Sequence, residues 1–287
     1  MRVCSLLPSA TEIVGALGLT GSLVGRSQEC DWPPEVREVP VVTASRVDSE
    51  RLPSLAIDQA VREALSDGLP LYAVDAELID RLRPDVIVTQ DLCRVCAVSS
   101  GDLRSLTAVE AEVISLEAST IAEIEQSVLV LAERLSVPER GREVVARMEA
   151  SLTSVRQAVA GCRRRRVFVS EWLDPPYAAG HWVPEMVELA GGEEVLGRPG
   201  QPSFRTTWEQ ALARSPELVV LAPCGFDLAR TVAEARLPDL PCPAVAVDAN
   251  SYFSRPAPRV ADGTRLLAFL LHPEAVADPG LPWAEIR

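Results

Sequence analysis

The sequence lacks several features that define common classes of protein. No stretch approaches the roughly 20 consecutive apolar residues that a membrane-spanning helix needs. Cations are in the minority, with 28 Lys and Arg against 41 Asp and Glu, and the net charge is −13. A nucleic-acid-binding surface needs clustered cations, and the one basic run, residues 163–166, is typical of a solvated junction before a strand. We therefore expect no nucleic-acid partner.

The motifs of common α/β enzymes are missing as well. There is no Gly-x-Gly-x-x-Gly sequence after the first predicted strand and no Walker-type phosphate loop. There is also no Gly-x-Ser-x-Gly sequence, which would place a nucleophilic serine on a sharp turn. The chain has only two histidines, His181 and His272. These absences favour a protein that is not an enzyme.

The cysteines and the N-terminus both bear on location. Seven cysteines are an odd number without the compact spacing of a disulfide framework, which indicates a reducing compartment. Met1 and Arg2 lead directly into an apolar segment, residues 3–7, that we predict to be the first strand. A charged, then apolar, then small-residue signal peptide is not recognisable. As it stands, the sequence predicts a cytoplasmic protein.

A helical connector over residues 119–161 leaves about the same mass of chain on either side. Apolar residues recur there at three- and four-residue steps, the pattern of two amphipathic helices. Thr120 and Glu123 have the spacing of a capping box, and Pro138 is suited to the first turn of the second helix. That helix, about 23 residues, would be roughly 35 Å long. We predict three segments: 1–118, 119–161 and 162–287.

Both halves alternate helices with short apolar strands. Pro84 and Pro216 each follow a predicted helix and precede a strand, and they are 132 residues apart. Val113 and Val245 open the next strands at the same offset, which indicates a structural repeat. Unalternating apolar strands are typical of parallel sheets covered on both faces. The predicted fold class is α/β, with one mostly parallel sheet in each of two lobes.

Two helix ends carry further local predictions. Ser9 and Glu12 have capping-box spacing, so we expect a helix that begins there and ends at Gly18. A last helix is predicted over residues 259–271, which leaves His272 as a surface residue. Residues 40–75 give no clear pattern apart from helical spacing over residues 57–65.

The loops after the strands are the candidate site, because open α/β sheets bind ligands at the carboxyl ends of their strands. Residues 172–182 hold three aromatic side chains and a histidine directly after a strand. Aromatic side chains on loops suit flat, partly apolar ligands. Trp32, beside two prolines, either presents a rigid aromatic face or folds over its own lobe. The candidates are Trp32, Trp172, Tyr177, His181, Trp182, Phe226, Tyr252 and Phe253.

A second interpretation rests on thiols. Cys93-x-x-Cys96 has the spacing of a redox pair or of half a zinc site. Cys30 and His181 are predicted in neighbouring loops and could converge with it, which would suit a cytosolic metal or thiol protein. A second Cys-x-x-Cys sequence is missing, and small buried thiols explain the same pattern.

Several segments resemble a known family when read together. They are Ser-Leu-Leu-Pro-Ser-Ala-Thr-Glu at 5–12, Asp-Trp-Pro-Pro at 31–34, Leu-Arg-Pro-Asp-Val-Ile-Val at 82–88 and Asp-Pro-Pro-Tyr at 174–177. The chain resembles the vitamin B12 (cobalamin)-binding proteins of ABC importers along essentially its whole length. These are helical-backbone (class III) periplasmic binding proteins, a group that includes haem and siderophore receptors. The resemblance implies two Rossmann-like lobes joined by a long rigid helix, with cobalamin or a related corrinoid in the cleft between them.

The resemblance also implies roles for particular residues. It puts Trp32 and Tyr177 on the corrin ring, with Tyr252 and Phe253 near it, and Gln90 stands where the family has a tryptophan. Residues 180–182 depart from the family pattern, and His181 among them is a candidate axial ligand of the metal because imidazole is a good ligand for such metals. Glu77 and Glu209 match the two surface glutamates that dock on arginines of an ABC permease. The resemblance implies an extracytoplasmic location, and haem or an iron–siderophore is the alternative ligand.

Overall fold

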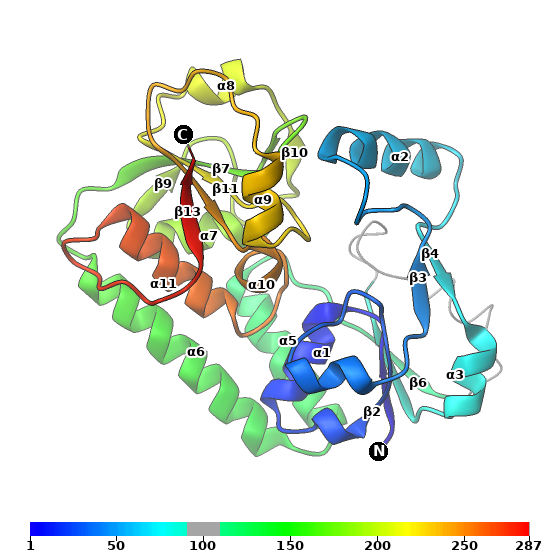
Figure 1. The fold of residues 1–287 in the computed structure, drawn as a ribbon. Helices are drawn as coiled ribbons and strands as arrows, with labels where there is room; N and C mark the ends of the chain where they lie inside the picture. The colour runs from blue at the N-terminus through cyan, green and yellow to red at the C-terminus, as the bar shows by residue number, and fades with distance from the viewer. Residues whose placement is uncertain (91–109, 287) are drawn as a thin grey trace. The chain divides into compact units, whose positions relative to one another are not determined.

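The computed structural model describes residues 1–90 and 110–286 and divides into two compact units (Figure 1). Unit 1 comprises Met1–Ala118 and Glu125–Val144, and unit 2 comprises Ser119–Ile124 and Val145–Arg287. The helices α5 (Ile121–Arg134) and α6 (Pro138–Ala158) therefore contribute residues to both units. Among the described residues, no helix is both long and apolar enough to span a bilayer.

Unit 1 is built on a parallel four-stranded sheet in the order β2-β1-β5-β6. β1 and β5 are buried along their whole length, which accounts for their unalternating apolar sequences. A separate antiparallel pair, β3–β4, lies outside this sheet. The elements are β1 (Val3–Ser5), α1 (Pro8–Ala16), η1 (Thr20–Ser22), β2 (Leu23–Arg26), η2 (Pro34–Glu38), β3 (Thr43–Ser45), α2 (Ser54–Ser66), β4 (Tyr72–Val74), α3 (Ala76–Leu82), β5 (Val86–Thr89) and β6 (Glu112–Ser115).

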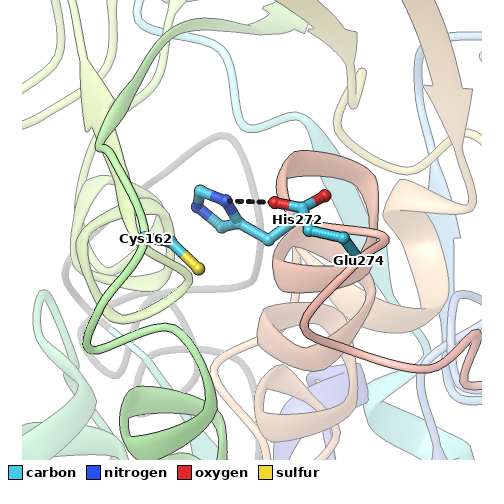
Figure 2. A group of neighbouring side chains, drawn as sticks. All are labelled: Cys162, His272 and Glu274. Carbon is cyan, nitrogen blue, oxygen red and sulfur yellow. Dashed lines mark ion pairs between the residues drawn. The ribbon is translucent and has the colours of Figure 1, made fainter.

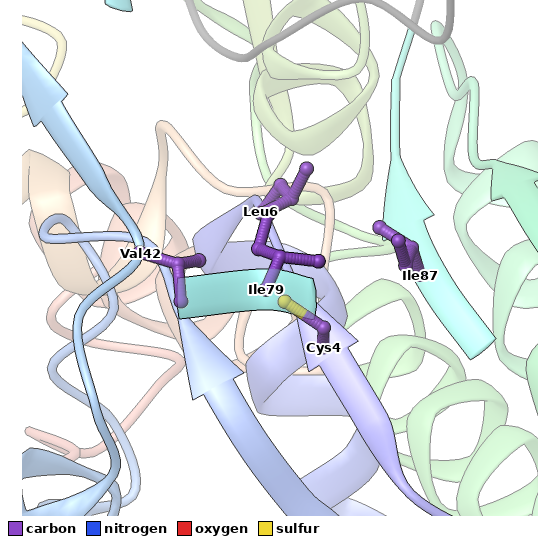
Figure 3. Packing of buried hydrophobic residues seen from close by; sticks show 5 residues of the cluster. All are labelled: Cys4, Leu6, Val42, Ile79 and Ile87. Atoms are coloured by element: carbon purple, nitrogen blue, oxygen red, sulfur yellow. The ribbon is translucent and has the colours of Figure 1, made fainter. Parts of the chain in front are cut away.

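Part of the core of unit 1 is a cluster that joins the sheet to α3 (Figure 3). Its buried members are Cys4, Leu6, Val42, Ile79 and Ile87. Burial raises the pKa of the Cys4 thiol to about 12, and nearby Cys30 adds to this effect. Cys4 therefore behaves as a small apolar side chain.

Unit 2 contains a seven-stranded mixed sheet in the order β10-β8-β7-β11-β12-β13, with β9 paired to β7. β7, β9, β11 and β12 form the parallel part, and β8, β10 and β13 add antiparallel strands. The elements are β7 (Arg165–Trp172), β8 (Tyr177–Ala178), α7 (Val183–Leu189), β9 (Gly192–Glu194), β10 (Phe204–Arg205), α8 (Trp208–Leu212), β11 (Leu218–Leu221), α9 (Leu228–Glu234), β12 (Ala244–Val247), α10 (Ala249–Tyr252), α11 (Val260–Leu271) and β13 (Trp283–Ile286).

The start signals of the two connector helices are confirmed. The Glu123 N–H donates to Thr120 Oγ1 at 3.2 Å, and the Thr120 N–H donates to the Glu123 carboxylate at 3.1 Å. α6 begins at Pro138, as predicted, and is 21 residues long. Gly141 lets the two helices come close, because a Cβ there would lie 2.5 Å from the Cβ of Ala132.

The capping box predicted at Ser9 is wrong. α1 begins at Pro8, its N-cap is Leu7, and no side chain caps it. Proline fixes a helical φ and has no N–H to satisfy, so Pro8 starts the helix one residue before the serine. The predicted end is right, since Gly18 follows the helix with φ +70°.

The surface position predicted for His272 is also wrong. Its side chain is 2% exposed, and its Nε2 lies 3.2 Å from the carbonyl oxygen of Gly191. A Cβ at residue 191 would lie 2.8 Å from Nε2, so the imidazole is buried in space that a glycine leaves open.

Candidate ligand-binding site

The loop after β2 presents an exposed aromatic side chain in unit 1. Trp32 is 43% exposed. Arg26, the last residue of β2, holds the loop by donating from its guanidinium to four backbone carbonyls. The acceptors are Ser27, Cys30, Arg37 and Val39, with donor–acceptor distances of 3.0–3.2 Å. One cation therefore ties together the chain on both sides of Trp32.

The same loop is anchored to α1. Pro33 packs so closely on Gly15 that a Cβ at residue 15 would lie 2.7 Å from the proline Cδ. Cys30 is 1% exposed, and its Sγ lies 3.0 Å from Thr11 Oγ1. This segment, residues 27–33, is called the Trp32 loop, and it is fixed at three points before any ligand arrives.

Other predicted residues of unit 1 have different positions. Gln90 directly follows β5 and is buried, at 8% exposed. Cys93 and Cys96 lie outside the described residues. Where the structure describes the chain, the side chains close enough to share a metal ion are Cys162, His272 and Glu274, a group that contains neither Cys30 nor His181.

In unit 2, Trp172 and Tyr177 are brought together by a tight turn. β7 ends at Trp172, and the chain returns as β8, which pairs with it antiparallel and sets Trp172 opposite Tyr177. Both side chains are half-buried. Trp172 meets the ring of Phe226 edge to face, with centroids 5.2 Å apart.

Three of the predicted aromatic residues are buried within unit 2. Phe226 is 2% exposed, and the Arg230 guanidinium lies 3.7 Å from its ring centroid. Trp182 and Phe253 are 7% and 1% exposed, and the indole N–H of Trp182 donates to the Phe253 carbonyl at 2.8 Å. Tyr252 remains half-buried. Of these buried rings, Phe226 contacts a half-buried one, that of Trp172.

His181 sits in a strained turn between β8 and α7. Its φ is +52°, a left-handed value that is uncommon for residues other than glycine, although Asn, Asp and His adopt it more often than the rest. Its N–H donates to the Gln201 carbonyl at 2.6 Å, and its own carbonyl accepts from the Gly200 N–H at 2.9 Å. The imidazole stacks on Trp182 with centroids 5.8 Å apart.

The imidazole of His181 has one nitrogen without a hydrogen-bond partner among the described residues, the buried Nδ1. Burial lowers the pKa of His181, so the ring is neutral at pH 7. A neutral imidazole with an unpaired nitrogen is a good ligand for a transition metal.

Two glutamates near this loop, one half-buried and one buried, were not predicted from the sequence. The Glu171 carboxyl accepts from the Gly180 N–H at 3.1 Å, and burial raises its pKa to about 8. Burial raises the pKa of Glu194 to about 7, although its carboxylate accepts from three backbone N–H groups. Glu171 could have been found from the sequence, because it is a glutamate inside the apolar run of β7.

The two glutamates predicted to dock on a permease are both exposed. Glu77 lies in the first turn of α3, and its carboxylate is 3.9 Å from the Arg81 guanidinium. Glu209 lies in the first turn of α8. Acidic side chains at these positions also complement the helix dipole.

Comparison with known proteins identifies the family. A model of the periplasmic binding protein family matches residues 3–236. A vitamin B12-binding protein of Yersinia pestis is 24% identical over 265 residues, which cover 90% of this chain and 82% of that protein. The α/β fold that the sequence predicted is confirmed by similar solved structures.

Two solved structures illustrate the similarity. The periplasmic vitamin B12 binding protein BtuF of Vibrio cholerae has a TM-score of 0.65 at 22% identity, over 94% of this chain and 96% of that one. A periplasmic heme binding protein from Pseudomonas aeruginosa has a TM-score of 0.72 at 18% identity, over 100% of this chain and 98% of that one. The chain belongs to the periplasmic binding protein family.

Proposed function

We propose that this protein binds cobalamin or a related corrinoid and delivers it to an ABC importer, outside the cytoplasmic membrane. The family is one of solute-binding proteins rather than enzymes, and the curated relatives it matches include vitamin B12-binding proteins. A corrin is a flat macrocycle with large apolar faces, so it calls for exposed aromatic side chains held on rigid loops.

The observation that carries the proposal is the Trp32 loop. Exposing 43% of an apolar indole to water is unfavourable for the free protein. The loop nevertheless holds Trp32 in this position, through contacts with Arg26, Gly15 and Thr11. A side chain that is ordered before binding loses little further entropy when the ligand arrives. Trp32 therefore has the properties of a preorganised stacking surface.

Unit 2 supplies the other aromatic candidates. Trp172, Tyr177 and Tyr252 are half-buried at the carboxyl-terminal ends of β7 and β12, where parallel sheets bind ligands. We assign direct ligand contact to these three residues. Phe226, Trp182 and Phe253 are buried, so we assign them the role of holding the contacting rings in place.

His181 is the proposed axial ligand of the cobalt. Its neutral ring and unpaired Nδ1 support this role. Glu77 and Glu209 are the proposed contacts with the permease, because each is an exposed carboxylate on the first turn of a helix.

Haem is the second candidate ligand, and iron–siderophore chelates belong to the same alternative. An imidazole nitrogen without a partner suits iron as well as cobalt. The fold is also similar to periplasmic heme binding proteins, with a TM-score of 0.72 for the Pseudomonas aeruginosa structure.

An absorbance titration of the purified protein separates the two ligands. Saturable one-to-one binding of aquocobalamin at micromolar Kd or tighter, about −8 kcal/mol or more favourable, supports the corrinoid. Tighter binding of haem, or no corrinoid binding at hundreds of micromolar, overturns it.

Matched variants test the proposed contacts. Trp32→Ala and Tyr177→Ala should each weaken corrinoid binding by about tenfold or more, as expected for aromatic residues that anchor a ligand. Leu69→Ala removes another exposed apolar side chain of unit 1 and should leave binding unchanged. Equal affinities for Trp32→Ala and wild type would refute the role of the Trp32 loop.

A further inference from the structure

A cysteine, a histidine and a glutamate of unit 2 converge at the ends of two helices (Figure 2). Cys162 lies just after α6, and its N–H donates to the Val159 carbonyl at 2.9 Å. His272 is the C-cap of α11, and Glu274 follows two residues later. One potential ligand atom from each side chain lies within 4.8 Å of the others.

The imidazole of His272 is fixed by a backbone carbonyl. A carbonyl oxygen only accepts hydrogen bonds, so the Nε2 that lies 3.2 Å from Gly191 O carries the proton in the neutral ring. Nδ1 is then left with a free lone pair. A metal-bound histidine almost always donates its second N–H in this manner.

The position of His272 is built into the fold. The ring is 2% exposed and occupies the space that Gly191 leaves open. Its backbone N–H donates to Ala268, and its carbonyl accepts from Val276 at 2.9 Å. The backbone of His272 is thus fixed at the end of α11, and burial against Gly191 restricts the imidazole.

The lone pair of Nδ1 faces a carboxylate. Glu274 Oε1 lies 3.7 Å from His272 Nδ1, although both atoms are acceptors when the histidine is neutral. A positive charge between them resolves this conflict, either as a proton on the ring or as a metal ion. A tetrahedral zinc ion, with bonds of about 2.0–2.3 Å, holds its ligand atoms roughly 3.3–3.8 Å apart.

We propose that Cys162 Sγ, His272 Nδ1 and the Glu274 carboxylate form a site for a divalent transition-metal ion of the zinc type. Thiolate, imidazole and carboxylate are the zinc ligands of proteins, and three of them leave a fourth position for water. Cys162 is half-buried and the Glu274 side chain is 65% exposed, so both can move the remaining distance. The thiol loses its proton when the metal binds.

The proposed metal would connect two separate parts of unit 2. Cys162 belongs to the junction between α6 and β7, whereas His272 and Glu274 follow α11. A metal that binds the folded state alone stabilises it, so Zn²⁺ should raise the melting temperature. This role does not depend on a corrinoid.

Cobalt(II) is the probe for this site, because a cobalt–thiolate bond gives charge-transfer absorption in the near ultraviolet. The chelator-treated, reduced protein should bind one equivalent of Co²⁺ with that absorption, and Zn²⁺ should displace it. Cys162→Ser should abolish the thiolate band, whereas Cys242→Ser, which changes another half-buried free thiol of unit 2, should retain it.

Glu274→Gln is the second variant, and because the side chain is 65% exposed the substitution should leave the fold intact. It should weaken Co²⁺ binding by about tenfold or more. Glu285→Gln, at an exposed position of β13, should leave Co²⁺ binding unchanged. A thiolate band that is absent in the wild type, or that persists in Cys162→Ser, overturns the site. Unchanged affinity in Glu274→Gln overturns it too, because the carboxylate is then not a ligand.

Discussion

The backbone of Gly15 lies so close to Pro33 that a Cβ at residue 15 would stand 2.7 Å from the proline Cδ. Gly15→Ala must therefore push away the loop that carries Trp32. We expect corrinoid binding to weaken by about two- to tenfold, since ordering one side chain on binding costs about 0.5–1.5 kcal/mol. The aquocobalamin titration measures this effect.

Gly21→Ala is the matched control for this variant. Nothing lies within 4 Å of a Cβ at residue 21, and its φ is not positive, so the substitution should change neither binding nor stability. Equal affinities for the two variants would show that the Trp32 loop does not need its support on α1.

A buried carboxyl group should make stability depend on pH. Burial raises the pKa of Glu171 from its ordinary value of 4.5 to about 8 in the folded state. The folded protein then holds a proton that the unfolded chain releases, so this contribution is complete below pH 4.5 and is lost as the pH rises through about 8. Urea unfolding should therefore give a free energy of unfolding that falls between pH 5 and pH 8.

Glu171→Gln tests the origin of this slope. The amide keeps an acceptor for the Gly180 N–H but does not titrate, so the fall in stability should become shallower. It should not vanish, because burial also raises the pKa of Glu194 to about 7. Glu188→Gln, at an exposed position of α7, should keep the wild-type slope, and an identical slope in Glu171→Gln would contradict the assignment.

Segments with a periodic apolar pattern, or with a proline at one end, made much of the fold predictable. The strands around Val86 and Val219 are apolar runs preceded by proline, and the structure has both as buried parallel strands. The β3–β4 pair was not predictable, because its three-residue strands are too short for alternation to appear. Pro8 overrode the capping signal at Ser9 for a local steric reason.

The candidate site was predictable only as a set of loops. The sequence marks Trp32 and Phe226 alike as aromatic residues after strands, yet one is 43% exposed and the other 2% exposed. This difference arises from tertiary contacts, such as that of Phe226 with Arg230, and no local pattern contains them. The burial of His272 likewise depends on Gly191, which is 81 positions away.

His181 should change the spectrum of the bound corrinoid. If its imidazole replaces the water on cobalt, the visible bands of aquocobalamin shift on binding, and His181→Ala abolishes the shift. Affinity should fall by about tenfold or more, since a metal–ligand bond is lost. A shift of the same size in His181→Ala would exclude axial ligation while leaving the aromatic contacts intact.

The cysteines should differ strongly in reactivity. Cys224 is exposed, whereas Cys4 and Cys30 are buried, and burial raises the pKa of Cys4 to about 12. The thiolate is the reactive form, so iodoacetamide should modify Cys224 in the native protein and reach Cys4 and Cys30 only in denaturant. Peptide mass spectrometry after a time course measures each site, and rapid native modification of Cys4 would contradict the buried β1.

Charge reversal at the two glutamates proposed to dock on the permease should impair delivery without impairing binding. Glu77→Arg and Glu209→Arg each place a cation where the proposed permease presents arginines, so like charges repel. In cells that lack their own vitamin B12-binding protein and express this chain, corrinoid uptake should fall by about tenfold. The aquocobalamin affinity of the purified variants should be unchanged. Glu149→Arg, at an exposed position of α6, should preserve uptake, and uptake that survives both glutamate reversals would refute docking through these residues.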